Sequence, residues 1–263
     1  MENDMKRVFK YFNTLTIILV TSSFAASQNP REISKKSADA IALGSMEMTT
    51  TLKIFDAKGN ARSRTLNMAS RKFGDVTKMM MKFTDPADVK GTSILIYDYE
   101  ERADEMWIYM PALKKTRRVV SNERGKNFMG SEFTNADMSK PNIEDFDYKI
   151  ISSENINGRA CHVIEATPVS QESLQSNGFS KKVSYIDKEN YLCYKIEYYD
   201  LKGKILKTQT IGDYRPVEGG SYFYYEMEMK NEQNGRKSVL KTEKFKPQSQ
   251  MTEAQFSPSN LDK

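Results

Sequence analysis

The sequence predicts a mainly β protein built as a single antiparallel meander, and three observations support this fold class. Apolar and polar residues alternate along many short segments, which is typical of strands with one buried face. Turn pairs such as Asn-Gly, Lys-Gly and Gly-Gly separate these segments at short intervals. Only one segment has a well-marked helical pattern. Together they favour roughly 10 to 12 strands with short connections over alternating strands and helices.

Composition adds limits on size and partners. The chain has 263 residues, of which 38% are hydrophobic and 29% charged, as is ordinary for a globular protein with a sizeable core. No shift in composition marks a second domain. The net charge of +5 is small and dispersed, which argues against nucleic acid as a partner.

The first 25 residues have the pattern of a secretory signal peptide. Basic Lys6, Arg7 and Lys10 precede an apolar run over residues 11–20, and small residues lie at the expected cleavage point after Ala25. The apolar run is shorter than the roughly 20 residues that a membrane-spanning helix needs. We therefore expect an exported protein whose mature domain comprises residues 26–263.

The mature chain opens with the one clear helix pattern. Asn29 is a candidate N-cap, Pro30 suits the first helical position, and Ile33 and Ile41 share a face that ends near Gly44. Shorter helical turns are expected near residues 134–138, 170–177 and 252–255.

The strands that follow place an apolar row on one face of the sheet. This row is rich in methionine, a flexible side chain that adapts to variable apolar partners, although a single methionine at an alternating position is usually plain core. The candidate lining residues are Met46, Met48, Leu52, Ile54, Met79, Met81, Phe83, Trp107, Tyr194, Ile196, Tyr198, Tyr225 and Met227.

A sheet of this size raises a packing problem that bears on function. One helix cannot cover the apolar face of ten or more strands, which twist and curl. Either the sheet closes into a barrel filled by its own side chains, or it curls into a half-open barrel with a helix and loops across a cavity.

Two cysteines, Cys161 and Cys193, are expected to remain unjoined even in an oxidising compartment. A strand over residues 181–187 falls between their strands, so in a meander they would lie about 9.6 Å apart, beyond the reach of a disulfide. Alternation also places Cys193 on the polar row with Lys195 and Glu197.

The segment from Asp104 to Met138 is the most distinctive part of the chain. It contains Trp-Ile-Tyr-Met-Pro-Ala-Leu-Lys-Lys-Thr-Arg-Arg from position 107, and then Phe-Met-Gly-Ser from position 128. Apolar residues occupy both faces of the strand around Trp107, so a loop or helix is expected to cover its outer side. With these motifs the mature chain resembles the outer-membrane lipoprotein-sorting protein family, the LolA-like periplasmic carriers.

The resemblance implies an incomplete antiparallel barrel with a helical lid, located in the periplasm, whose apolar interior holds acyl chains. On this reading the lining residues given above would contact the acyl chains. The expected lid residues are Ile33, Ile41, Phe128, Met129 and Phe133. An inner-membrane transporter and an outer-membrane acceptor would be its partners.

The densest basic run has two interpretations. It comprises Lys114, Lys115, Arg117 and Arg118. It is either a solvated surface or a basic rim that meets lipid phosphate or an acidic partner.

The sequence argues against enzymatic activity and against a metal or cofactor site. The single histidine, His162, lies in a strand and is more typical of a structural role, and no nucleophile elbow, phosphate loop or metal-binding spacing is present. Two hypotheses follow: a periplasmic carrier that shields the acyl chains of a lipoprotein or lipid, or a non-catalytic envelope accessory protein with a self-filled barrel, acting beside a membrane transporter.

Overall fold

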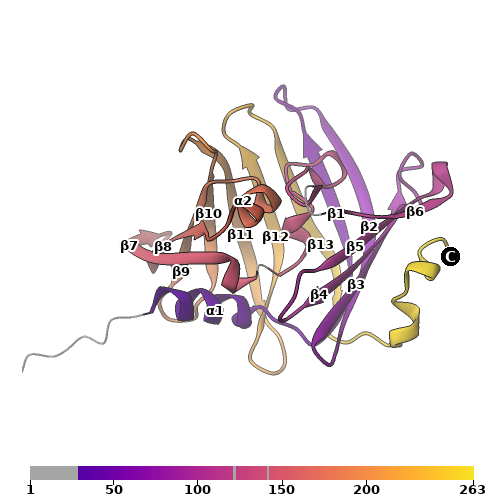
Figure 1. Cartoon of the computed structure of the whole chain (residues 1–263), viewed down its shortest axis with the longest axis horizontal. Helices are drawn as coiled ribbons and strands as arrows, with labels where there is room; N and C mark the ends of the chain where they lie inside the picture. Colours follow the sequence, from indigo (N-terminus) through magenta and orange to yellow (C-terminus); the bar gives the residue numbers. More distant parts are fainter. Residues whose placement is uncertain (1–28, 121–122, 141) are drawn as a thin grey trace, which may run out of the picture.

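The computed structural model describes residues 29–120, 123–140 and 142–263, in which 13 strands form one antiparallel sheet (Figure 1). The expected signal peptide, residues 1–25, lies outside these ranges. The strands are β1 (Ser45–Phe55), β2 (Ala61–Phe73), β3 (Val76–Asp85), β4 (Ser93–Tyr99), β5 (Glu105–Met110), β6 (Lys115–Arg118), β7 (Phe146–Ile156), β8 (Arg159–Pro168), β9 (Lys181–Asp187), β10 (Cys193–Tyr199), β11 (Ile205–Pro216), β12 (Tyr222–Asn231) and β13 (Lys237–Lys246). The expected fold class is confirmed.

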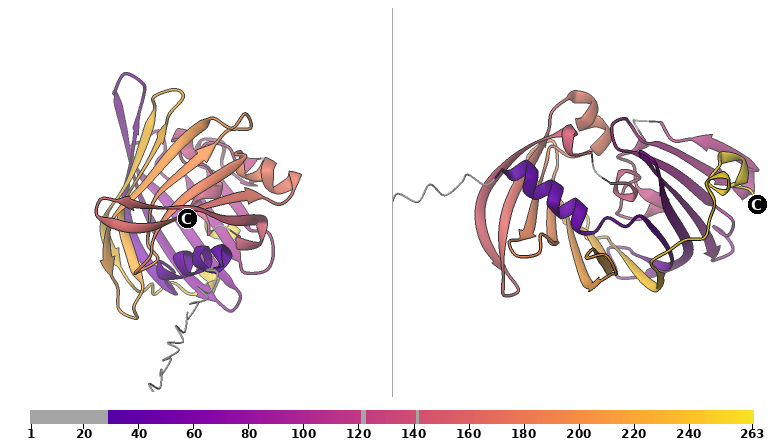
Figure 2. Two further views of the ribbon diagram at one scale, coloured as in Figure 1. Left: turned by 90° about the vertical axis from the view of Figure 1, so that its left-hand side faces the viewer. Right: turned by 90° about the horizontal axis from the view of Figure 1, so that it is seen from below.

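The order of the strands determines where the sheet is open. It runs β6-β5-β4-β3-β2-β1-β13-β12-β11-β10-β9-β8-β7, so the first and last strands of the chain pair with each other. Strands β6 and β7 are consecutive in the chain but form the two free edges of the sheet. The link between them, residues 119–145, must therefore pass from one edge to the other. The sheet curls without closing, and α1 lies across one end of the curl (Figure 2).

Strand register aligns the apolar rows on the inner face of the curl. Leu52 of β1 lies opposite Leu240 of β13, and Met81 of β3 lies opposite Met68 of β2 and Ile94 of β4. All five belong to, or pack against, the main core cluster. Because side chains alternate between faces along a strand, the period of two seen in the sequence becomes one continuous apolar interior.

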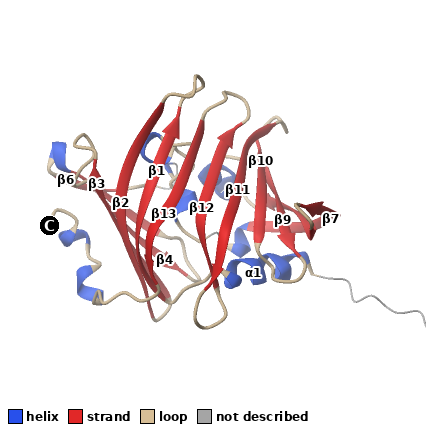
Figure 3. Cartoon of the chain, turned by 180° about the vertical axis from the view of Figure 1, so that it is seen from behind, coloured by secondary structure: helices blue, strands red, loops and turns tan. Residues whose placement is uncertain are grey.

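The outer face carries a second apolar cluster beneath the C-terminal segment, residues 247–263, which we call the strap (Figure 3). Phe256 and Leu261 of the strap pack with Leu95 of β4 and with Trp107 of β5. The hydroxyl of Tyr97 donates a hydrogen bond to the carbonyl oxygen of Phe256 at 2.6 Å. The strap therefore covers the outer face of the strand around Trp107. This is the cover that we expected because the strand is apolar on both faces.

The helices form where local capping signals predicted them. In α1 (Pro30–Ala40) the Asn29 side chain accepts a hydrogen bond from the amide of Arg31 at 3.0 Å, and Pro30 occupies the first turn. The helix ends at Ala40, before Gly44. In α2 (Gln171–Asn177) the Ser170 side chain supplies the cap. The turns expected near 134–138 and 252–255 are the short 3-10 helices Ala136–Met138 and Glu253–Gln255.

The described part of the chain contains no helix of the length and apolar character needed to cross a membrane.

The two cysteines lie on opposite faces of the sheet. Strand β9 pairs with both β8 and β10, as the meander required. Cys161 packs in a cluster with Val163, whereas Cys193 packs with residues under α1, and both thiols are free. The assignment of Cys193 to the polar row was wrong, because a register irregularity between Cys193 and Lys195 moves Cys193 to the inner face.

Candidate functional site

The interior of the curled sheet contains one small cavity of about 90 Å³. Its walls come from β1, β2, β3, β12 and β13 and from the link between β6 and β7. The lining residues are Met46, Met48, Thr50, Leu66, Met68, Met79, Met81, Phe128, Asp137, Met138, Phe223, Tyr224, Tyr225, Met227, Leu240 and Thr242. Ligand pockets usually measure about 300–1,000 Å³, so this cavity is smaller than an ordinary ligand pocket. The side chains of the protein itself fill most of the interior.

Most of the lining residues expected from the sequence lie in or around this cavity. Those that line it directly are Met46, Met48, Met79, Met81, Tyr225 and Met227. Those that pack in the surrounding core are Leu52, Ile54, Phe83, Ile196 and Tyr198. The sequence analysis did not identify the lining residues of β2 and β13, which are Leu66, Met68 and Leu240. They alternate with polar residues, but the many charged residues of these two strands obscure the apolar row.

Two expected lining residues lie elsewhere. Trp107 faces outward and packs under the strap. Side chains alternate between the two faces of β5, and the neighbouring Met106 and Ile108 face inward. Tyr194 lies at the register irregularity of β10, where its ring packs against Tyr214 at 5.3 Å between centroids. Neither side chain lines the cavity.

The interior is filled by residues 128–138 of the link, which we call the plug. Phe128 and Phe133 are fully buried in the main core cluster, and Met129 packs against it. Met129 and Gly130 adopt left-handed backbone angles (φ 48° and 73°), a region open to glycine, and the turn lets the amide of Phe128 donate to the carbonyl of Phe133 at 2.7 Å. The expected lid residues Phe128, Met129 and Phe133 thus lie inside the curl rather than over its mouth.

The two helical lid residues take different positions. Ile33 of α1 is buried against Ile164 of β8 and Ile186 of β9, and so closes one end of the interior. Ile41 follows the helix as its C-cap and stays half-buried, outside the core clusters of the described residues.

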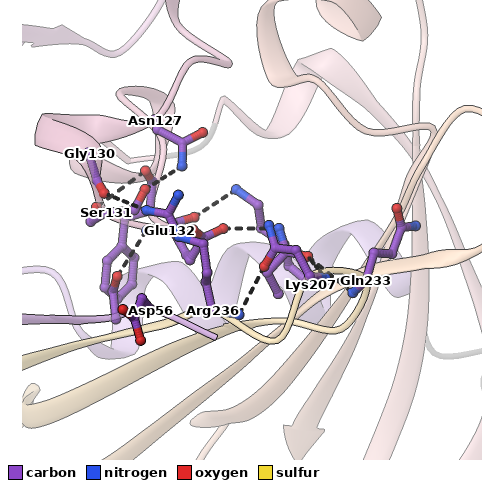
Figure 4. Close-up of polar contacts among 12 residues, drawn as sticks. Asp56, Asn127, Gly130, Ser131, Glu132, Lys207, Gln233 and Arg236 are labelled. Atoms are coloured by element: carbon purple, nitrogen blue, oxygen red, sulfur yellow. Dashed lines mark hydrogen bonds and ion pairs between the residues drawn. The ribbon is translucent and has the colours of Figure 1, made fainter. Parts of the chain in front are cut away.

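A buried carboxylate, Glu132, fastens the plug to the sheet (Figure 4). Its Oε1 lies 3.0 Å from Nε of Arg236, and its Oε2 accepts a hydrogen bond from Nδ2 of Asn231 at 3.0 Å. The backbone amide of Glu132 donates to Oγ of Ser238 at 2.9 Å, and its carbonyl accepts from Nζ of Lys207 at 2.6 Å. With the side chain only 2% exposed, these contacts form a latch between the plug and the β11–β13 strands.

A second attachment joins the rest of the link to the β4–β5 hairpin. Asp104 lies 2.9 Å from Nη2 of Arg124, and Oδ2 of Asp98 accepts a hydrogen bond from the amide of Lys140 at 3.0 Å. Burial, reinforced by the neighbouring charge of Asp104, raises the pKa of Asp98 to about 6.

The basic run lies at the free edge formed by β6. All four of its residues, Lys114, Lys115, Arg117 and Arg118, are exposed. Arg117 pairs with Glu123 at 2.6 Å and Arg118 with Glu105 at 2.9 Å. Two of the four charges are therefore already neutralised, whereas Lys114 and Lys115 form no ion pair with any residue that the structure describes.

A larger hollow of about 450 Å³ lies on the outer face between β1, β2, β13 and the strap. Two of its three lysines are engaged locally, since Lys82 contacts the carbonyl of Lys263 and Lys246 contacts Glu47. This hollow is open and lacks the enclosing walls of the interior, so the interior is the candidate site.

A family model described as "Uncharacterized protein" matches residues 75–263, and no curated protein matches the chain. A solved outer membrane lipoprotein-sorting protein domain from Vibrio parahaemolyticus is 30% identical with a TM-score of 0.82, and the match covers 89% of this chain and 98% of that one.

Two further solved structures share the fold. A DUF1329 family protein from Desulfovibrio piger is 23% identical, with a TM-score of 0.80 and coverage of 88% of this chain and 97% of the other. A LolA superfamily protein from Nitrosomonas europaea is 18% identical, with a TM-score of 0.68 and coverage of 87% and 97%. From the extent and identity of the Vibrio match, the chain belongs to the outer membrane lipoprotein-sorting protein family.

Proposed function

We propose that this protein is a non-catalytic periplasmic carrier that shields acyl chains of a lipoprotein or lipid inside its half-open barrel. The observation that carries the proposal is the continuous methionine-rich inner face, on which Met46, Met48, Met79, Met81 and Met227 surround one cavity. Methionine side chains repack easily, which suits an interior that must be occupied and emptied.

The energetics of the interior support such a role. Each methylene buried is worth about 0.8 kcal/mol, so about ten methylenes supply roughly 8 kcal/mol before the cost of ordering the chain. The present cavity is too small for such a chain, and Phe128 and Met138 occupy its walls. Binding therefore requires the plug to withdraw and expose the apolar surface that it now covers.

Membership of the family also suggests the cellular setting. We infer export through the signal peptide, cleavage after Ala25, and exchange of cargo with an inner-membrane transporter and an outer-membrane acceptor. Exposed Lys114 and Lys115 at the β6 edge offer a contact for an acidic partner or lipid phosphate. N-terminal sequencing of the exported protein should give Ala26 as the first residue, and an intact Met1 in the membrane fraction would contradict this inference.

The carrier proposal is tested by displacement of a fluorescent fatty acid. Met227→Trp places a large side chain in the half-buried cavity wall, whereas Glu226→Trp places the same residue on the exposed outer face of the same strand. We expect the first substitution to weaken probe binding at least tenfold and the second to leave it unchanged. Equal binding by both folded variants would show that the interior is not the binding site.

A self-filled accessory protein is the second candidate, and the cavity volume of about 90 Å³ favours it. Native mass spectrometry of protein purified from cells separates the two. Co-purified lipid supports the carrier. A bare mass, together with no binding of the fluorescent fatty acid, supports the accessory protein.

A further inference from the structure

One lysine on the inner face of the sheet forms no close ion pair among the described residues. Lys182 of β9 lies opposite Tyr198 of β10 and Ala166 of β8, both of which belong to the main core cluster. Its Nζ lies 4.6 Å from the ring centroid of Phe146. Among the described residues it forms no hydrogen bond or ion pair with a carboxylate, whereas the adjacent Lys181 lies 2.6 Å from Glu165.

A second inward-facing lysine lies on the neighbouring part of the sheet. Lys207 of β11 lies opposite Tyr198 on the same face, and its Nζ donates to the carbonyl of Glu132. Asp137, which lines the cavity, interacts electrostatically with both Lys182 and Lys207. Lys207 also interacts with the Glu132 carboxylate, so Asp137 is the only carboxylate that acts on Lys182 among the described residues.

Both lysines are half-buried against the apolar core, which disfavours their charged forms. Burial lowers the pKa of both Lys182 and Lys207, and the charge of Asp137 only partly opposes this effect. A buried charge is tolerated best when an opposite charge or hydrogen-bond acceptor lies beside it. An anionic group brought by a ligand would supply that partner for Lys182.

We propose that Lys182, assisted by Lys207, binds the anionic head group of an acylated ligand, either a carboxylate or a phosphate. The inference rests on the proposed carrier function and narrows its cargo to anionic amphiphiles. The acyl chain lies along the methionine-rich wall, and the head group lies toward β9 and β11, beyond Asp137. An uncharged lipid end would give the Lys182 ammonium no additional opposite charge, so neutral lipids bind more weakly.

The test uses three competitors with the same chain and different heads: hexadecanoate, hexadecyl phosphate and hexadecanol. Each displaces a fluorescent fatty acid from the full mature protein. We expect at least one anionic competitor to bind about tenfold more tightly than the alcohol, which corresponds to about 1.4 kcal/mol. Preference for the phosphate indicates a phospholipid head group as the source, and preference for the carboxylate indicates a free fatty acid.

Variants then assign the preference to Lys182. Lys182→Met should remove the advantage of the anionic competitors while leaving hexadecanol binding unchanged, and Lys182→Arg should retain much of the advantage. Lys181→Met is the matched control, because it removes the same charge from the adjacent position on the outer face. Thermal unfolding confirms that each variant is folded.

The outcomes separate this inference from the proposal on which it rests. Equal affinity of wild type for all three competitors would overturn the anion site but leave the carrier function standing. Loss of the preference in Lys181→Met as well would attribute it to net charge and overturn the role of Lys182. No measurable binding of any competitor or of the probe would overturn the carrier function itself.

Discussion

Weakening the latch at Glu132 should make the interior easier to fill. Glu132→Gln keeps the shape of the side chain but removes its charge, so the ion pair with Arg236 is lost and the hydrogen bond from Asn231 has a neutral acceptor. Charge-assisted hydrogen bonds contribute about 1.5–3 kcal/mol and neutral ones about 0.5–1.5 kcal/mol. The Arg236 side chain is 38% exposed, which reduces its share through solvent screening. We therefore expect Glu132→Gln to destabilise the state in which the plug is inserted by about 1.4 kcal/mol.

Under the proposed function the plug and an acyl chain compete for one apolar surface, so this loss should appear as a gain in affinity. A change of about 1.4 kcal/mol shifts the equilibrium between inserted and withdrawn plug about tenfold, and apparent affinity rises by up to the same factor. The assay is titration with a fluorescent fatty acid, paired with thermal unfolding. Glu228→Gln is the control, since it removes an equal charge from a pair with Lys237 on the outer face. A lower Tm for Glu132→Gln with unchanged or weaker probe binding would refute competition between plug and ligand.

Three further predictions concern the frame around the site. Alkylation of unreduced, denatured protein should label both Cys161 and Cys193, since they lie on opposite faces of the sheet; labelling only after reduction would contradict the topology. Phe256→Ala should lower the free energy of unfolding by about 3–5 kcal/mol and shift the emission of Trp107, the single tryptophan, to the red. The pKa of Asp98, raised to about 6, means that wild type loses stability as pH rises from about 4 through 6. Asp98→Asn should remove this slope and add roughly 2 kcal/mol at neutral pH, as urea unfolding at several pH values will show.

Much of the sheet could be predicted from the sequence because one physical signal determines it. Alternation along β1 and β3 placed Leu52 and Met81 on the inner face, and strand pairing aligned those rows as expected. The helix caps at Asn29 and Ser170 were also readable, since a cap depends only on neighbouring residues.

The parts that sequence reasoning missed depend on long-range contacts. The register irregularity after Cys193 changes which residues face inward, and no local pattern marks it. Trp107 was assigned to the interior because its cover, the strap around Phe256, comes from the far end of the chain. The latch at Glu132 joins residues about a hundred positions apart, so the acidic residue following Phe-Met-Gly-Ser carried no signal of its own.

Under the proposed carrier function, the contents of the interior bear on how an acyl chain would be released. Burial of Phe128, Phe133 and Met138 contributes about 1.5–3 kcal/mol for each side chain, or roughly 5–9 kcal/mol for the plug. Burial of about ten methylenes of an acyl chain against the same surface contributes roughly 8 kcal/mol. Since the two contributions nearly cancel, we expect the proposed binding of an acyl chain to be weak in net terms and reversible. Small additional interactions, such as the Glu132 latch on one side and a head group at Lys182 on the other, then decide whether the plug or the cargo occupies the interior.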